Sequence, residues 1–583
     1  MGRQRAKKRA RRAANALAES RNPLSAAKRY VDSATVFGGP ITPSALVDRI
    51  KTFNWRDSFV RLGQLAADVA HDKSGPRSKK VQAWAREQIL EMTGIDPRAI
   101  ANAHAWARGH DDAVIVHEEG VDFLQHVVLL HGLEEGDAPS DRELVLWLIG
   151  AGQFLGEWEN DADADQTEQL IAEIVRVSRF NNHEDPVNLL VRVRQIFGKP
   201  PFEGALSKPE TWAAIQQAAF GQSFEQHLAT RVVPFYGESL RWGTDEGRLP
   251  VLVPEQWVRN LGDDGKPIVH WVFDLAKTRD EINALTRTRM LPDGLLPRAP
   301  TALVRHPILR LSDDRVGVAS PWRVLAHLRT GIWAAFLNGT KAVLGKPHEW
   351  FPAFGYMFEE WLRTVARWAA AGPAFRGRLL LPDFPGSANE IDDVVFVEGN
   401  TTFLFSAKAR LVEEPVARHA KSQRMVMDWY EKYFFAAGDD EFRGGAVRQF
   451  DRRINRIRAG TYKDFPADNR IVPVLVTYDS LCEEFLLYKW LQERCKALGV
   501  LQQEGVTPLV LAHVDDFDRL MARASRGLSL LEFFKAREFA WDSRKLQLQL
   551  GVYELEDRLP QVVAAFEELM NSVSIRLAGQ PPR

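Results

Sequence analysis

The sequence predicts a multidomain α/β protein, and three observations support this prediction. The chain has 583 residues, whereas a single hydrophobic core stops growing near about 250 to 300 residues. Apolar residues recur at helical spacing through the first part of the chain, as at Phe59, Leu62 and Leu65. After residue 232, short β-like runs alternate with helical stretches. We therefore expect five segments: a basic, flexible tail (1–37), a helical domain (38–232), a mixed α+β connector (233–345), an α/β domain (346–545) and a helical extension (546–583).

Composition excludes several classes of protein. The chain holds 76 basic and 77 acidic residues, so a net charge of −1 selects neither nucleic acid nor a membrane as partner. The two cysteines, Cys482 and Cys495, are too few for a disulfide scaffold and are not spaced as a zinc-binding CxxC pair. The longest nearly apolar run, 144–156, is shorter than the ~20 residues that cross a bilayer. We expect a cytoplasmic protein with no membrane partner.

The tail is rich in arginine and lysine over residues 1–12. Such a block is typical of a solvated tail, and also of a segment that becomes helical on a phosphate surface. Both interpretations stay open.

The connector is predicted from frequent prolines and glycines between short apolar runs. The runs Pro267–Asp274 and Ala302–Leu311 predict strands, and Pro321–Leu337 predicts a helix. A glycine-rich phosphate loop of the GxxxxGK[ST] kind is absent from the sequence, which argues against an ATP-driven motor.

The α/β domain is predicted to follow the order helix, three strands, helix, strand. An amphipathic pattern predicts the first helix, and Gly399-Asn400 suits a tight turn between the second and third strands. A proline in the first turn predicts the start of the second helix. The predicted elements are a helix over Phe354–Ala371, strands over Arg378–Leu381, Ile391–Val397 and Thr402–Ala407, a helix from Glu414 to Phe435 and a buried strand over Ile471–Thr477.

Within this domain, three short motifs occur in a fixed order: Gly355-x-x-Phe358-Glu359 on the first helix, Glu390-Ile391-Asp392, and Ser406-x-Lys408. Together with the αβββαβ order, they resemble the PD-(D/E)XK nuclease superfamily, most closely its nuclease-related-domain and restriction-endonuclease-like branches. The resemblance covers about a quarter of the chain. It implies a restriction-endonuclease-like core in the C-terminal part.

The resemblance also implies a divalent-metal-dependent nuclease with Mg²⁺ or Mn²⁺ as cofactor. Asp392, Glu359 and the backbone carbonyl of Ala407 are the implied metal ligands, and Lys408 is implied to orient or deprotonate the attacking water. These residue types suit the chemistry, because hard cations take oxygen ligands and a metal with a nearby lysine can offset charge on the phosphoryl transition state.

Ser406 departs from the family pattern, which has an acid at this position. A hydroxyl is a weaker ligand than a carboxylate, and Glu359 or Glu360 on the helix is the natural substitute. Glu390 is a further alternative acid. The competing hypothesis is a catalytically degenerate nuclease fold that acts as a nucleic-acid-binding sensor or scaffold.

The choice between Asp392 and Asp393 depends on the hairpin. If Gly399 and Asn400 alone form the loop, Asp393 pairs with Ser406 and Asp392 points away, because side chains alternate across a strand. One extra residue in the turn brings Asp392 opposite Ser406 instead. The resemblance favours Asp392, and Asp393 stays the alternative.

Basic side chains near the site are candidates for nucleic-acid binding. Arg448, Arg452 and Arg456 recur every four residues on a predicted helix, which fits either phosphate contact or an ordinary solvated face. Lys421 and Arg424 are candidates on the same grounds.

The resemblance favours DNA over RNA as substrate and suggests a bacterial restriction or anti-phage defence effector. In such proteins a trigger partner acts on the accessory domains, here the N-terminal helical domain. The sequence does not indicate the oligomeric state.

Overall fold

The computed structural model describes most of the chain. The described residues are 31–70, 76–93, 96–110, 113–155, 171, 185–244, 249–262, 265–288, 290–291, 293–297, 302–381, 392–409, 423–437, 444–462, 467–479, 481, 485–538 and 557–577. Most of the predicted basic tail, Glu390 and Lys421 lie outside these residues.

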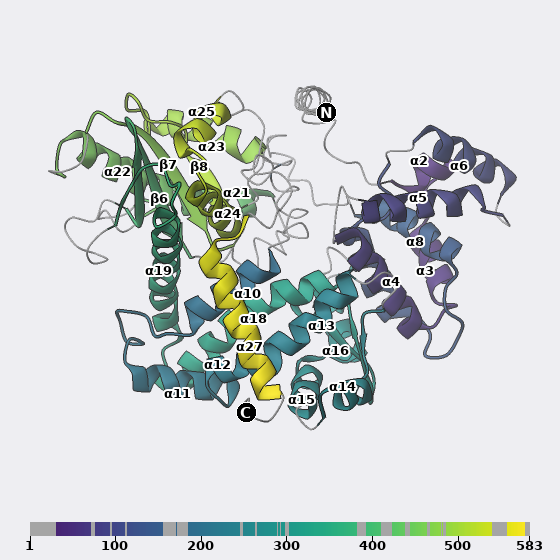
Figure 1. Ribbon diagram of the computed structural model, residues 1–583. Coiled ribbons are helices and arrows are strands. Elements are labelled where there is room, and N and C mark those ends of the chain that lie inside the picture. Colours follow the sequence, from purple (N-terminus) through teal and green to yellow (C-terminus); the bar gives the residue numbers. More distant parts are fainter. Residues whose placement is uncertain are drawn as a thin grey trace, which may run out of the picture. The chain divides into compact units, whose positions relative to one another are not determined.

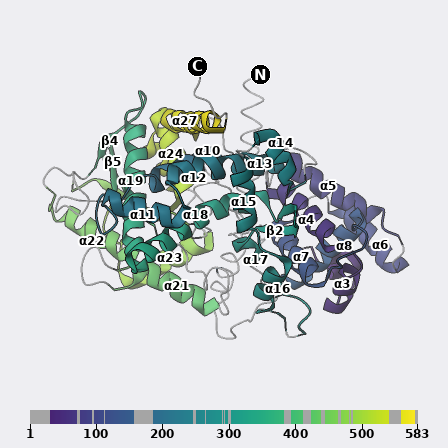
Figure 2. The same ribbon diagram turned by 90° about the horizontal axis from the view of Figure 1, so that it is seen from below.

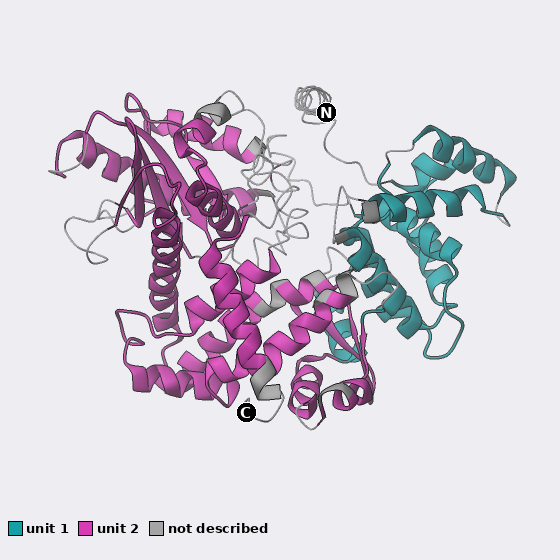
Figure 3. Cartoon of the chain, viewed as in Figure 1, with its two compact units in different colours: residues 1–158, 247–250, 278–303 teal, residues 159–246, 251–277, 304–583 magenta. Residues whose placement is uncertain are grey.

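The chain divides into two compact units (Figure 3). Unit 1 comprises residues 1–158, 247–250 and 278–303, and unit 2 comprises 159–246, 251–277 and 304–583. This division splits the predicted helical domain, 38–232, between the two units. The multidomain α/β prediction is confirmed, because helices dominate and two separate sheets are present.

The described elements of unit 1 are all helices. The helix α4 packs against α7, and the predicted apolar positions Phe59, Leu62 and Leu65 are buried on it. The bounds are α2 (Ser33–Phe37), α3 (Pro43–Ile50), α4 (Trp55–Ala70), α5 (Pro76–Leu90), α6 (Pro97–Gly109), α7 (Glu118–His131), α8 (Asp141–Phe154) and α16 (Arg279–Arg287).

The first part of unit 2 is mixed α+β. Its three-stranded antiparallel sheet has the order β1-β3-β2. The bounds are α10 (Pro186–Phe197), α11 (Pro209–Phe220), α12 (Phe224–His227), the π-helix η1 (Leu228–Val232), α13 (Val233–Thr244), β1 (Val251–Leu252), α14 (Pro254–Leu261), α15 (Gly265–Leu275), β2 (Ile308–Ser312), β3 (Arg315–Val318) and α18 (Pro321–Leu344). The short helix α17 (Ala302–Arg305) lies where unit 1 gives way to unit 2.

The predicted strand over Pro267–Asp274 is wrong, because this segment is the helix α15. Ile268 and Val272, four residues apart, are both buried on its inner side, so the spacing was helical. Pro267 is tolerated since it lies in the first turn. The predicted run Ala302–Leu311 divides into α17 and β2.

The second part of unit 2 contains a five-stranded mixed sheet in the order β4-β5-β6-β7-β8. Figure 1 labels β6, β7 and β8 of this sheet, and Figure 2 labels β4 and β5. Strands β4, β5 and β6 are antiparallel neighbours, whereas β6, β7 and β8 are parallel. The bounds are η3 (Pro347–Glu349), α19 (Trp350–Ala370), β4 (Arg378–Leu380), β5 (Val394–Glu398), β6 (Thr401–Lys408), α21 (Gln423–Phe435), α22 (Ala446–Arg458), β7 (Arg470–Thr477), α23 (Phe485–Leu498), β8 (Val510–His513), α24 (Val514–Ser525), α25 (Leu530–Glu538) and α27 (Pro560–Leu577).

Alternate residues of β6 face different helices. Phe405 packs edge-to-face on Phe517 of α24, with ring centroids 5.4 Å apart. Lys408, three residues on and therefore on the other face, meets α22 instead. The sheet thus has helices on both faces, and polar groups gather between β6 and α22.

The C-terminal helix α27 lies along α10 (Figures 1 and 2). Arg558, just before α27, donates to Asp185 at the start of α10 with an Nη2–Oδ2 distance of 2.6 Å. Helices α10 and α27, the large sheet and α19 share one apolar core. None of the described helices is long and apolar enough to cross a membrane.

Candidate active site

The candidate site lies where β5 begins and β6 ends. The hairpin brings these two points together, because β5 and β6 are antiparallel and joined by the two-residue turn at Gly399 and Asn400. Gly399 has a φ of +59°, which glycine adopts without strain. Helix α19 supplies Glu359 from one side, and α22 supplies further groups from the other.

Asp393 lies beside Ser406, as the two-residue turn requires. The pairing runs from Glu398–Thr401 to Val394–Phe405 without interruption. The extra-residue turn that would have brought Asp392 opposite Ser406 is therefore wrong. The Asp393 carboxylate accepts the backbone N–H of Ala407 at 2.6 Å and the Ser406 hydroxyl at 3.4 Å.

Asp392 nevertheless lies in the same cluster. The chain bends at Asp393 before β5 begins, so strand alternation does not fix the direction of Asp392. Its Oδ1 accepts the N–H of Asp393 at 2.9 Å and Nη1 of Arg453 at 2.6 Å. Its Oδ2 is buried and has no hydrogen-bond partner among the described residues.

Burial dominates the electrostatics of Asp392. It raises the pKa of this carboxyl to about 6, against the opposing effect of the Arg453 charge. A negative charge at this position is therefore costly without a further cation.

Lys408 is partly buried and held by α22. Its Nζ donates to Oε1 of Gln449 at 2.6 Å. Burial lowers the pKa of the Lys408 amine, and the charge of Arg453 lowers it further, while Asp393, Glu359 and Asp392 oppose the shift. A lowered pKa increases the fraction of neutral amine near neutral pH, and the neutral amine is the form that can accept a proton.

Of the two glutamates on α19, one faces the site. Glu359 lies 3.6 Å from Nη2 of Arg363, and the same nitrogen lies 3.7 Å from Oδ1 of Asp393. Glu360 instead pairs with Arg367 at 2.8 Å, where both side chains are about half exposed. Glu360 is therefore engaged outside the candidate site in this arrangement.

The carbonyl of Ala407 lies on the side of the acids. The carbonyl of Lys408 accepts from Tyr478 next to β7, at 3.2 Å, and successive carbonyls along a strand point to opposite sides. The carbonyl of Ala407 consequently points toward the β5 side, where its N–H meets Asp393.

The oxygens of Asp392, Asp393 and Ala407 meet some of the requirements of a hard divalent cation. Among the described residues, no three histidine, cysteine, aspartate or glutamate side chains gather closely enough to hold a metal. Mg²⁺, however, is commonly held by one or two carboxylates, with water and phosphate completing its octahedron. The buried, unbonded Oδ2 of Asp392 and the nearby carboxylate of Asp393 are the oxygens that fit this pattern.

Comparison of the chain with family models, with curated proteins and with solved structures found no match. The resemblance to PD-(D/E)XK nucleases therefore depends on the sequence motifs and their order alone.

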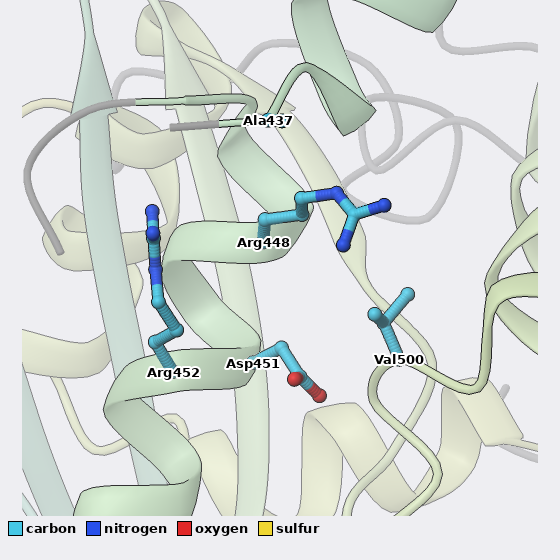
Figure 4. Close-up of a pocket in the computed structure, with 5 residues that line it drawn as sticks. All are labelled: Ala437, Arg448, Asp451, Arg452 and Val500. Carbon is cyan, nitrogen blue, oxygen red and sulfur yellow. The ribbon is translucent and has the colours of Figure 1, made fainter. Parts of the chain in front are cut away.

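The candidate basic residues on α22 lie four residues apart, on one side of the helix. Arg448, Arg452 and Arg456 are partly buried, and Arg448 and Arg452 line a shallow hollow with Ala437, Asp451 and Val500 (Figure 4). Figure 4 shows the two arginines leaving α22 in different directions. Asp451 accepts hydrogen bonds from Leu501 and Gln503, so it belongs to the local structure. On α21, the Arg424 side chain is 84% exposed, and its Nε lies 4.0 Å from the carboxylate of Asp428.

Three site residues were missed in the sequence: Arg363, Gln449 and Arg453. Gln449 and Arg453 are buried and four residues apart, on a helix whose other buried side chains are mostly apolar. Two polar residues at this spacing, next to an apolar stripe, are the signal that could have pointed to an inward-facing polar pair.

Proposed function

We propose that the protein is a divalent-metal-dependent nuclease that hydrolyses phosphodiester bonds, with DNA as its substrate. The observation that carries the proposal is that Asp392, Asp393 and Glu359 lie close enough to the Lys408 amine to raise its pKa against the effect of burial. The hairpin register brings the segment before β5 to the end of β6, and α19 supplies Glu359.

A bound Mg²⁺ or Mn²⁺ would supply Lewis-acid stabilisation of the phosphoryl oxygens and a more acidic water. Asp392, Asp393 and the carbonyl of Ala407 are the groups that would hold it. Glu359, whose carboxylate lies 3.6 Å from Nη2 of Arg363, is a candidate to bind the metal through water.

Lys408 has the task of orienting the attacking water and accepting its proton. Its lowered pKa increases the fraction of neutral amine available for this step. Gln449 fixes the direction of the amine through its Oε1, and it is therefore a positioning residue. Arg448, Arg452 and Arg456 would contact phosphates farther along the nucleic acid.

A second candidate function is favoured by the pairing of every acid with an arginine. Asp392 pairs with Arg453, while Asp393 and Glu359 share Arg363. Together with Ser406 at the position of the usual acid, this suits a catalytically degenerate nuclease fold that only binds nucleic acid.

Cleavage assays separate the two functions. Plasmid DNA, single-stranded DNA and RNA would each be incubated with Mg²⁺ or Mn²⁺, beside an EDTA control. Metal-dependent cutting of DNA supports the proposal, whereas cutting of RNA alone would overturn the choice of substrate. Retained binding without cutting, under every metal condition, would favour the degenerate fold.

A further inference from the structure

The charges of the candidate site cancel among the described residues. Glu359, Asp392 and Asp393 are acidic, whereas Arg363, Lys408 and Arg453 are basic. A divalent cation entering alone would leave uncompensated positive charge in a largely buried cluster, whether the Lys408 amine is protonated or neutral, which is unfavourable.

Arg453 is the basic residue in closest contact with an implied metal ligand. Its Nη1 is 2.6 Å from Asp392 Oδ1 and 3.2 Å from the Ser406 hydroxyl. The arginine therefore occupies the space between Asp392 and the position of the usual family acid. Both partners are buried, so solvent screens the interaction little.

We infer that Arg453 is a built-in counter-ion that couples metal binding to nucleic-acid binding. The inference rests on the proposed nuclease function and goes beyond it. Phosphodiester groups carry the negative charge that compensates a divalent cation in this cluster, so the metal and the nucleic acid bind together. Arg453 then exchanges a carboxylate for a phosphate, a partner that guanidinium groups bind well.

Two comparisons of Mn²⁺ affinity test this coupling, read by electron paramagnetic resonance of free Mn²⁺. Wild type should bind Mn²⁺ at least ten-fold more tightly with a short DNA duplex than without it, after subtraction of Mn²⁺ bound by the duplex alone. The variant Arg453→Gln, which keeps a donor for Asp392, should bind Mn²⁺ at least ten-fold more tightly than wild type without DNA.

A matched control and a double variant make the test specific. Arg367→Gln removes an exposed positive charge from α19 and should leave Mn²⁺ affinity within two-fold of wild type. Asp392→Asn with Arg453→Gln removes both charges of the pair and should not gain affinity. If Arg453→Gln is unfolded without metal, its folded fraction against Mn²⁺ concentration gives the affinity once the unfolding equilibrium of the metal-free variant has been taken into account.

The outcomes distinguish the inference from the proposed function. Tight Mn²⁺ binding by wild type without DNA, unchanged in Arg453→Gln, would overturn the counter-ion role and leave a metal-dependent nuclease in place. Absence of Mn²⁺ binding in both proteins, with and without DNA, would overturn the counter-ion role and the metal-dependent function together.

Discussion

Arg453 and Asp392 form a buried ion pair, with 2.6 Å between Nη1 and Oδ1. The pair joins α22 to the segment just before β5, two elements separated by 61 positions in the sequence. Gln449, one turn earlier on α22, holds Lys408 at the end of β6. One helix therefore controls both the acid and the amine of the candidate site.

The two glutamates on α19 should differ in their importance for cleavage. Glu359→Gln should lower the cleavage rate about tenfold or more. The wild-type carboxylate acts on the Lys408 amine, and it shares Nη2 of Arg363 with Asp393. Glu360→Gln is the matched control and should stay within two-fold, since Glu360 pairs with the exposed Arg367. Single-turnover cleavage rates check this, and equal losses in both variants would contradict the assignment.

A buried arginine away from the site should contribute strongly to the unfolding free energy of unit 2. Arg192 is 0% exposed and bonds Asp518 at 2.7 Å and Asp515 at 3.2 Å. Arg192→Leu should cost about 3 to 5 kcal/mol of unfolding free energy, because it leaves two buried carboxylates without this partner.

The neighbouring Arg194 provides the control for that variant. It pairs with Glu225 and Glu568, which are 44% and 70% exposed. Arg194→Leu should cost only about 1 kcal/mol or less, since exposed pairs contribute little. Chemical denaturation of both variants gives their unfolding free energies. A similar loss in each would show that the buried ion pairs of Arg192 contribute no more to stability than the exposed pairs of Arg194.

A buried histidine should make the protein less stable in acid. Burial lowers the pKa of His227 from its ordinary 6.5 to about 3, and the nearby Arg231 charge adds to the shift. The folded protein therefore prefers neutral His227. This stabilising contribution is complete above pH 6.5 and is lost as the pH falls toward 3.

His227→Phe should remove this part of the pH dependence. The ring stacks on Phe220 with centroids 4.4 Å apart, and an aromatic replacement keeps that contact. Between pH 7 and 4.5, wild type should lose about 2 to 3 kcal/mol more unfolding free energy than the variant. Parallel losses in the two proteins, measured by denaturant titration at each pH, would refute the role of His227.

Much of the α/β fold could be predicted from local sequence signals. The Gly399-Asn400 turn and the apolar runs around it predict the hairpin, and the structure has β5 and β6 paired across that turn. The fifth strand, β8, was not predicted, because the short run Val510–His513 carries little periodicity. The β-branched residues of the segment 267–274 favour a strand, whereas the burial of Ile268 and Val272 four residues apart is that of a helix.

The composition of the candidate site was harder to predict than its position. Lys408 and the acids at 392 and 393 follow from the motif and the hairpin. Arg453 and Gln449 come from a helix that follows β6 in sequence, and only the packing of α22 on the sheet brings them to Asp392 and Lys408. The spacing of Gln449 and Arg453 beside an apolar stripe marks them as inward-facing, but no local pattern identifies the residues that they meet.

The measurement that tests the central claim most directly is DNA cleavage by Lys408→Ala beside Lys432→Ala, with Mg²⁺ or Mn²⁺ and an EDTA control. Lys432 is exposed on α21, so its variant controls for the loss of a lysine charge. The account predicts metal-dependent cleavage by wild type and Lys432→Ala, and at least a hundred-fold loss in Lys408→Ala with DNA binding retained. Undiminished cleavage by Lys408→Ala would contradict the assigned site.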